Sequence, residues 1–163
     1  LNGESLGKQE NTADKKNTLV WEVPYVHGIL KAVSYNKGNE VGTAALESAG
    51  KVEKIRLSAD RTEIVADGND LSYITLELVD SKGIRNQLAE ELVEFFIEGD
   101  ATIEGVGNAN PMSVEGFVAS SRKTWRGSNL LVVRSGKTSG KVIVTAKVQG
   151  LPVANIIINQ RSK

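Results

Sequence analysis

Short runs in which apolar and polar residues alternate recur along the chain, and they constrain its fold more than any other feature. In residues 73–80, Ile74, Leu76 and Leu78 alternate with more polar neighbours. Successive side chains of a strand point to opposite faces, so this run predicts a half-buried strand with these three residues inward. The same alternation in residues 92–98 and 142–148 predicts a further inward set: Val93, Phe95, Ile97, Val142, Val144, Ala146 and Val148.

Turn-forming residues separate these runs from other short apolar segments. Clusters such as residues 36–39, 67–70 and 80–83 are rich in Asn, Asp, Gly and Ser, which favour tight turns. Strands at roughly 8–12-residue intervals with such punctuation predict an all-β fold, an immunoglobulin-like antiparallel β-sandwich. The remaining predicted strands cover residues 19–23, 30–35, 40–45, 54–58, 63–66, 101–105, 114–119, 130–134 and 153–159.

Two domains are predicted, with the boundary at Gly50. Residues 52–163 hold enough strands for a sandwich of about seven, whereas residues 1–50 hold too few and predict a partial β-sandwich unit, cut partway through. A bare strand edge is a template for pairing. We therefore expect residues 1–50 to pack on the second domain or to self-associate with another copy, burying part of Trp21, Val23 and Val33.

Composition excludes several classes of partner and chemistry. The 163 residues include 20 Lys and Arg against 20 Asp and Glu, and they include no Cys. A net charge of zero predicts no nucleic-acid binding, and the lack of Cys rules out disulfides and cysteine-based zinc sites. No apolar run approaches the ~20 residues of a membrane helix, so no membrane partner is predicted. The first residue, Leu1, and the absence of a signal-peptide pattern lead us to expect a processed protein or an excised piece.

Four motifs raise functional hypotheses, and each has a simpler structural interpretation. The glycine-rich segment 105–111 ends at Pro111 and is followed by a predicted strand instead of the helix that a phosphate loop needs. A turn built on glycine backbone angles is therefore predicted. His27, the only histidine, is expected in a surface turn. Asp67, Asn69 and Asp70 offer oxygen ligands for calcium without EF-hand spacing. The other acidic residues fall in turns or on outward strand positions, which predicts no catalytic carboxylate pair, no metal site and no cofactor.

The two tryptophans differ in context. Trp21 lies within a predicted strand and is expected to pack in a core. Trp125 lies in the polar turn of residues 122–127, so it is the candidate carbohydrate-binding residue of the chain. Sugar-binding surfaces usually present several coplanar rings, and aromatic residues make up only 5% of this chain. We therefore predict that Trp125 packs against protein in preference to sugar.

Three stretches of the first fifty residues resemble the region that follows the catalytic barrel in bacterial family 2 glycoside hydrolases of the β-galactosidase type. They are LNGESLG (residues 1–7), LVWEVPY (19–25) and GILKAVSY (28–35), closed by SAG (48–50). The polar segment 7–17 between them falls where family members differ in length.

The second part resembles the bacterial immunoglobulin-like unit that follows in the same family and that is also found in invasin-type adhesins. The similarity is carried by IRLSAD (55–60), IVADG (64–68), YITLELVD (73–80) and GVGN (105–108). The GVGN run, with Pro111, Phe117, Arg122 and Lys123 downstream, favours the glycosidase version. Family members often carry Phe or Tyr at the position of Trp125.

The resemblance implies a non-catalytic structural or accessory C-terminal region whose main partner is the catalytic barrel of the parent chain. The family's catalytic glutamates lie in a (β/α)8 barrel of roughly 250 residues, and no residue here matches them. The parent is expected to be a retaining enzyme that removes terminal β-galactose, periplasmic or secreted. A carbohydrate-binding module and an adhesin repeat are the alternatives. The substrate, linkage and oligomeric state of the parent stay open.

Overall fold

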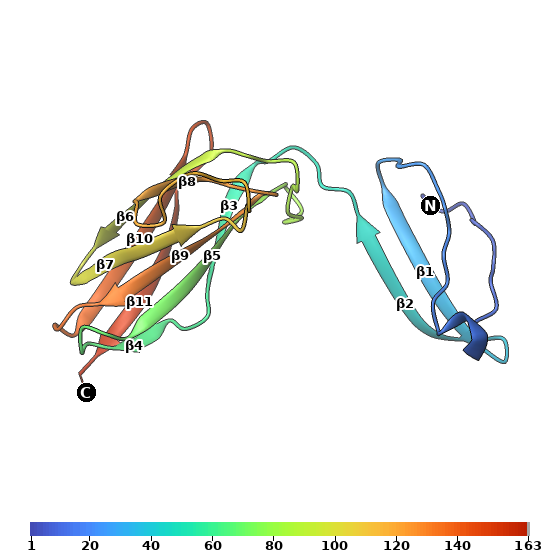
Figure 1. Ribbon diagram of the computed structural model, residues 1–163, viewed down its shortest axis with the longest axis horizontal. Helices are drawn as coiled ribbons and strands as arrows, with labels where there is room; N and C mark the ends of the chain where they lie inside the picture. Colours follow the sequence, from blue (N-terminus) through green and yellow to red (C-terminus); the bar gives the residue numbers. More distant parts are fainter. Residues whose placement is uncertain (163) are drawn as a thin grey trace. The chain divides into compact units, whose positions relative to one another are not determined.

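The computed structural model describes residues 1–162, and its regular elements are strands apart from one short 3-10 helix, η1 (Ala13–Lys15) (Figure 1). The chain divides into two compact units, Leu1–Ser48 and the part from Ala49 onward. The strands are β1 (Ile29–Asn36), β2 (Asn39–Glu47), β3 (Lys54–Ala59), β4 (Glu63–Val65), β5 (Leu71–Val79), β6 (Leu92–Glu98), β7 (Ala101–Gly107), β8 (Ser121–Lys123), β9 (Ser128–Ser135), β10 (Gly140–Val148) and β11 (Ala154–Arg161).

The first unit is built on one antiparallel hairpin, β1–β2. Its turn is formed by Lys37 and Gly38 with φ of 48° and 84°, and two successive positive φ values are typical of the tight turns that join twisted strands. The chain before β1 is tied to it by Asn2, whose side-chain oxygen accepts from the Ile29 backbone N–H at 2.8 Å and whose amide donates to the His27 carbonyl at 3.1 Å.

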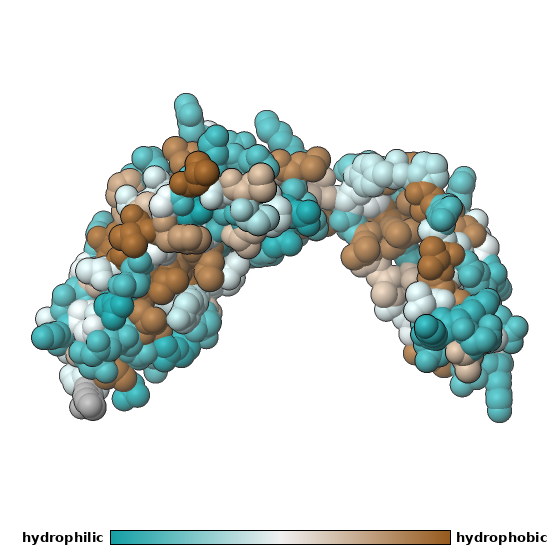
Figure 2. All heavy atoms as spheres, in the orientation of Figure 1, coloured by the Kyte–Doolittle hydropathy of each residue, from teal (hydrophilic) through white to brown (hydrophobic). Residues whose placement is uncertain are grey.

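The strand predicted over residues 19–23 is wrong, because these residues form no ladder with a neighbouring strand. Trp21 keeps 40% of its surface exposed, and Val23 is exposed as well, so the predicted core position of Trp21 is also wrong. Val33, on β1, is half-buried. Figure 2 shows that apolar side chains reach the surface in both units.

The second unit is a two-sheet sandwich with immunoglobulin-like topology. One sheet has the order β3-β5-β9-β7 and the other β4-β11-β10-β6-β8. Counting strands from β3, the first order corresponds to A-B-E-D, and β11-β10-β6 corresponds to G-F-C, of the immunoglobulin fold. The pairs are antiparallel except β4–β11, which is parallel, because the chain passes from the first sheet to the second between β3 and β4.

The core lies between these sheets, and the predicted inward residues belong to it. Ile74, Leu76 and Leu78 of β5 are fully buried. Ile97 is half-buried and packs against the cluster. The other predicted residues, Val93, Phe95, Val142, Val144, Ala146 and Val148, are buried. The alternation therefore gave the correct register on β5, β6 and β10.

The strand predicted over residues 114–119 is wrong. This segment belongs to an irregular loop between β7 and β8 and forms no strand ladder. Its Gly116 carbonyl accepts from Arg122, and its Phe117 carbonyl accepts from the Val106 N–H of β7. The short β8 follows the loop and pairs with β6. Three residues are too few to show a periodic pattern, and the central one, Arg122, is a charged residue on the buried face.

Candidate functional site

Several acidic residues of the sandwich hold turns together through backbone N–H groups. Asp80 follows β5, and its carboxylate accepts from the backbone N–H groups of Gly50 at 2.8 Å, Ile84 at 2.8 Å and Lys82 at 3.0 Å. These donors, Gly50 foremost and then Ile84, lower the pKa of Asp80. Asp80 therefore joins the backbone at Gly50, which precedes β3, to the 80–84 turn.

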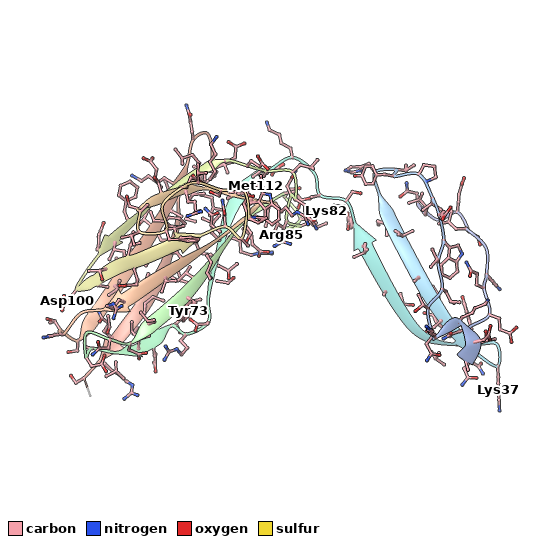
Figure 3. The ribbon with its side chains drawn as sticks, viewed as in Figure 1. Lys37, Tyr73, Lys82, Arg85, Asp100 and Met112 are labelled. Carbon is pink, nitrogen blue, oxygen red and sulfur yellow. The ribbon has the colours of Figure 1, made fainter. Side chains whose placement is uncertain are left out.

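Asp100 has the equivalent role between β6 and β7, at the tip labelled in Figure 3. One carboxylate oxygen accepts from the backbone N–H groups of Thr138 at 2.7 Å and Lys137 at 2.9 Å. Hydrogen bonds from Thr138 are the main cause of a lowered pKa for Asp100. The carboxylate thus joins the β6–β7 turn to the β9–β10 turn.

The hypothetical calcium ligands of the 67–70 turn are also used within the fold. One Asp67 oxygen accepts from the backbone N–H groups of Asn69 and Asp70. Asp70 accepts from the Val65 N–H and from Arg61, and the Val65 bond is the main cause of its lowered pKa. Within residues 1–162, no three acidic or histidine side chains converge as a metal site would need.

The direction of the pKa shifts separates these carboxylates from the general acid of a glycosidase active site. A general acid in glycoside hydrolysis needs a raised pKa, so that it holds a proton to donate. Here hydrogen bonds lower the pKa of Asp70, Asp80, Asp100, Glu104 and Glu115. These groups are stabilised as carboxylates and serve as hydrogen-bond acceptors of the scaffold.

A shallow pocket of about 400 Å³ lies in the second unit between residues 51–52, 86–91 and 148–151. Its polar lining includes Lys51, Asn86, Glu91 and Gln149. Among these described lining residues Glu91 alone carries a carboxylate, whereas hydrolysis of a glycoside uses two.

Trp125, the sequence-predicted carbohydrate candidate, lies in a two-residue turn before β9. Its backbone N–H and carbonyl both bond to Ser128 at 3.1 Å, with Arg126 and Gly127 at positive φ between them. The ring is half-buried, and the Arg126 guanidinium carbon lies 4.6 Å from its centroid. A cation at this distance interacts favourably with the ring face and competes with a sugar for it.

The glycine-rich segment differs from its prediction. Gly105 and Gly107 lie in β7 without positive φ, and the left-handed residue is Ala109 at φ 58°. A side chain on Gly105 would meet the Phe117 carbonyl oxygen at 3.3 Å, so this glycine allows close approach of the following loop. Asn108, as predicted, bonds locally, accepting from the Asn110 N–H at 3.1 Å.

The remaining candidate, His27, is exposed next to β1 and lies in a bend, as predicted.

Among the described residues, no helix has the length and apolar character that a membrane crossing requires.

Comparison with known proteins identifies both parts of the chain. The model of glycoside hydrolase family 2 C-terminal domain 5 matches residues 55–157, and that of a domain of unknown function (DUF4982) matches residues 1–42. Beta-galactosidase BoGH2A of Bacteroides ovatus is 35% identical over 159 residues, which are 98% of this chain and 19% of that protein. A putative beta-glucuronidase of Formosa agariphila is 31% identical over 113 residues, which are 69% of this chain and 11% of that protein.

A solved structure extends the match to the whole fold. A glycosyl hydrolase family 2 member from Bacteroides cellulosilyticus is 89% identical, with a TM-score of 0.96 over 99% of this chain and 21% of that one. The chain therefore spans about a fifth of the length of such relatives.

The second unit is thus an immunoglobulin-like sandwich whose carboxylates with shifted pKa values accept hydrogen bonds from its own turns, loops and strands. The chain belongs to the glycoside hydrolase family 2 C-terminal domain 5 family and is a C-terminal region of a family 2 enzyme.

Proposed function

We propose that this chain is a non-catalytic structural region of a retaining family 2 enzyme that removes terminal β-galactose, and that the catalytic barrel of the same polypeptide is its main partner. The observation that carries the proposal is the use of its carboxylates. Asp80, Asp100 and Glu115 accept backbone N–H bonds and have lowered pKa values, which suits structural acceptors and not proton donors to a leaving group.

The galactoside assignment is supported by a beta-galactosidase that is 35% identical over 98% of the chain. A β-glucuronide is the second candidate substrate, because a putative beta-glucuronidase matches 69% of the chain at 31% identity. The two substrates differ in the configuration at C4 and in the group at C6, where the glucuronide carries a carboxylate that a binding site recognises through a cationic partner. That partner would belong to the barrel of the parent enzyme.

The purified chain of residues 1–163 is expected to hydrolyse neither a nitrophenyl β-galactoside nor the corresponding β-glucuronide. The full-length enzyme is expected to hydrolyse the galactoside, and with Asp100→Asn its kcat should stay within about twofold below the melting temperature, because the lost hydrogen bonds affect stability alone. Release of nitrophenol is the measurement. Turnover by the isolated chain that a substitution within it abolishes would contradict the proposal, and preference of the parent for the glucuronide would select the second substrate.

A carbohydrate-binding role is the alternative function, and it depends on Trp125. We expect no saturable fluorescence change when galactan is added to a Trp21→Phe variant, in which Trp125 is the remaining tryptophan. The reason is that Arg126 already occupies one face of a single, half-buried ring. A saturable change that disappears in Trp125→Ala would favour the binding module.

We also propose that the first unit is part of a larger sandwich, with the domain boundary close to Gly50. A lone two-stranded hairpin is marginally stable in water, and this one leaves Leu46, Val41 and Tyr35 exposed. Pairing with a neighbouring strand of the parent chain would cover such residues, as would self-association of residues 1–50.

A further inference from the structure

One loop of the sandwich exposes four large apolar side chains within seven residues. This apolar loop, residues 109–119, connects β7 to β8. Met112 is 84% exposed, Val114 100%, Phe117 67% and Val118 85%. Single exposed apolar residues are ordinary on protein surfaces, but a contiguous group marks an interaction site. Met112 is labelled in Figure 3.

A buried arginine holds the apolar loop in place. Arg122, on β8, lies opposite Val93 of β6 in the ladder, so its side chain points to the inner side of the sheet edge, where it is 2% exposed. Its guanidinium donates to the carbonyl of Gly116 at 3.2 Å and to Ser113 Oγ at 3.1 Å. It also lies 4.7 Å from the centroid of the Phe117 ring. Burial of a charge is costly without such partners, so the loop and Arg122 stabilise each other.

Backbone contacts add to this rigidity. The Phe117 carbonyl accepts from the Val106 N–H of β7 at 2.8 Å, and the Asn110 side chain accepts from the Met112 N–H at 3.0 Å. The loop is therefore organised before it meets a partner, which lowers the entropy lost on binding. The rigid loop thus holds side chains that stay largely exposed, which suits a contact outside the sandwich.

The chemistry of the loop defines the partner. Its acid, Glu115, is engaged internally, accepting from Ser113 Oγ at 3.0 Å and from the Lys123 N–H at 3.1 Å, with Arg122 Nε at 3.8 Å. The outward face is then aliphatic and aromatic, without a free charge from Glu115 or Arg122. Such a face fits an apolar protein surface and offers little to an anionic polymer or lipid headgroup.

We propose that the apolar loop docks on an apolar patch of another domain of the same family 2 enzyme chain. The length of the related polypeptide supports this choice of partner. In the 89% identical structure this region is 21% of the polypeptide, so about four-fifths of that chain lies outside it. A neighbour on the same polypeptide is present at high effective concentration, which suits a small apolar contact. The inference rests on membership of a family 2 enzyme and not on the proposed substrate.

Met112 makes the proposal testable, because it is the one methionine among the 163 residues. The full-length enzyme is treated with dilute hydrogen peroxide, and the sulfoxide of the Met112 peptide is followed by mass spectrometry. We expect oxidation about tenfold slower than in the urea-unfolded enzyme, because docking covers the thioether. Val114→Asp should restore the rate to within about twofold of the unfolded value, since a buried unpaired carboxylate opposes docking.

The design separates docking from other causes of protection. Val114 is fully exposed in the sandwich, so Val114→Asp leaves the sandwich itself intact. Ser139→Asp adds the same charge to an exposed turn outside the loop and should keep Met112 protected. Oxidation of wild-type Met112 at the unfolded rate, equal effects of the two variants, or protection that appears only as the molecular mass doubles would each overturn the proposal. The readout does not use hydrolysis, so its failure is distinct from failure of the proposed function.

Discussion

Replacement of Phe95 by alanine is expected to lower the free energy of unfolding of the sandwich by about 3–5 kcal/mol, the range for removal of a buried phenyl ring. Phe95 lies on β6, is 2% exposed and belongs to the cluster between the sheets. Its loss leaves a cavity that strands on both sides cannot collapse to fill. Urea denaturation followed by Trp125 fluorescence, in a Trp21→Phe background, reports unfolding of this unit alone.

Phe96 is the matched control for this change. It is the next residue on β6, points to the other face and is 45% exposed, with the Lys147 ammonium 4.6 Å from its ring centroid. Phe96→Ala should cost about 1 kcal/mol, through loss of the cross-strand and cation contacts. Equal costs for the two substitutions would show that the assigned inward and outward faces of β6 are wrong.

Replacement of Gly127 by alanine is expected to cost about 3 kcal/mol, from left-handed backbone strain and the loss of neighbouring hydrogen bonds. Gly127 has φ +70°, and an added Cβ would lie 2.1 Å from the Asn86 carbonyl oxygen. The Gly127 carbonyl accepts from the Leu78 N–H, and its own N–H donates to Ala89, both at 2.9 Å. Relief of the clash must displace the 86–89 segment and weaken these bonds. The same denaturation assay measures the effect.

Gly150 separates the backbone strain from the clash. It has φ +79° but no atom within 4 Å of an added Cβ, so Gly150→Ala should cost about 1 kcal/mol. If Gly150→Ala proved as destabilising as Gly127→Ala, the close approach to Asn86 would have no energetic role.

The strands that bury one face were predictable from sequence because burial imposes a period of two. On β5, β6 and β10 the side chains that reach the core are those that alternation selects, and a shift of one residue would move all of them to solvent. The family could also be recognised, since motifs such as GVGN at residues 105–108 are local in sequence.

Two strand predictions were wrong because a run of apolar residues can occur outside a strand. Residues 114–119 contain apolar side chains, but Arg122 and β7 hold them as a loop with those side chains outward. Residues 19–23 are mostly apolar but form no ladder with another strand. The role of Gly105 was also misassigned, because the carbonyl that approaches it belongs to Phe117, twelve residues later in the chain.

The all-β class, the inward faces of the main strands and the family follow from the amino-acid sequence alone, because each depends on residues close together in the chain. Tertiary structure decided which acidic residues bind distant turns, as Asp100 binds Thr138. It also decided that Arg122 is buried beneath an apolar loop whose side chains face outward. The first feature depends on a contact between residues 38 positions apart, and the second depends on the path of the loop around Arg122. Strand periodicity carries no information about either.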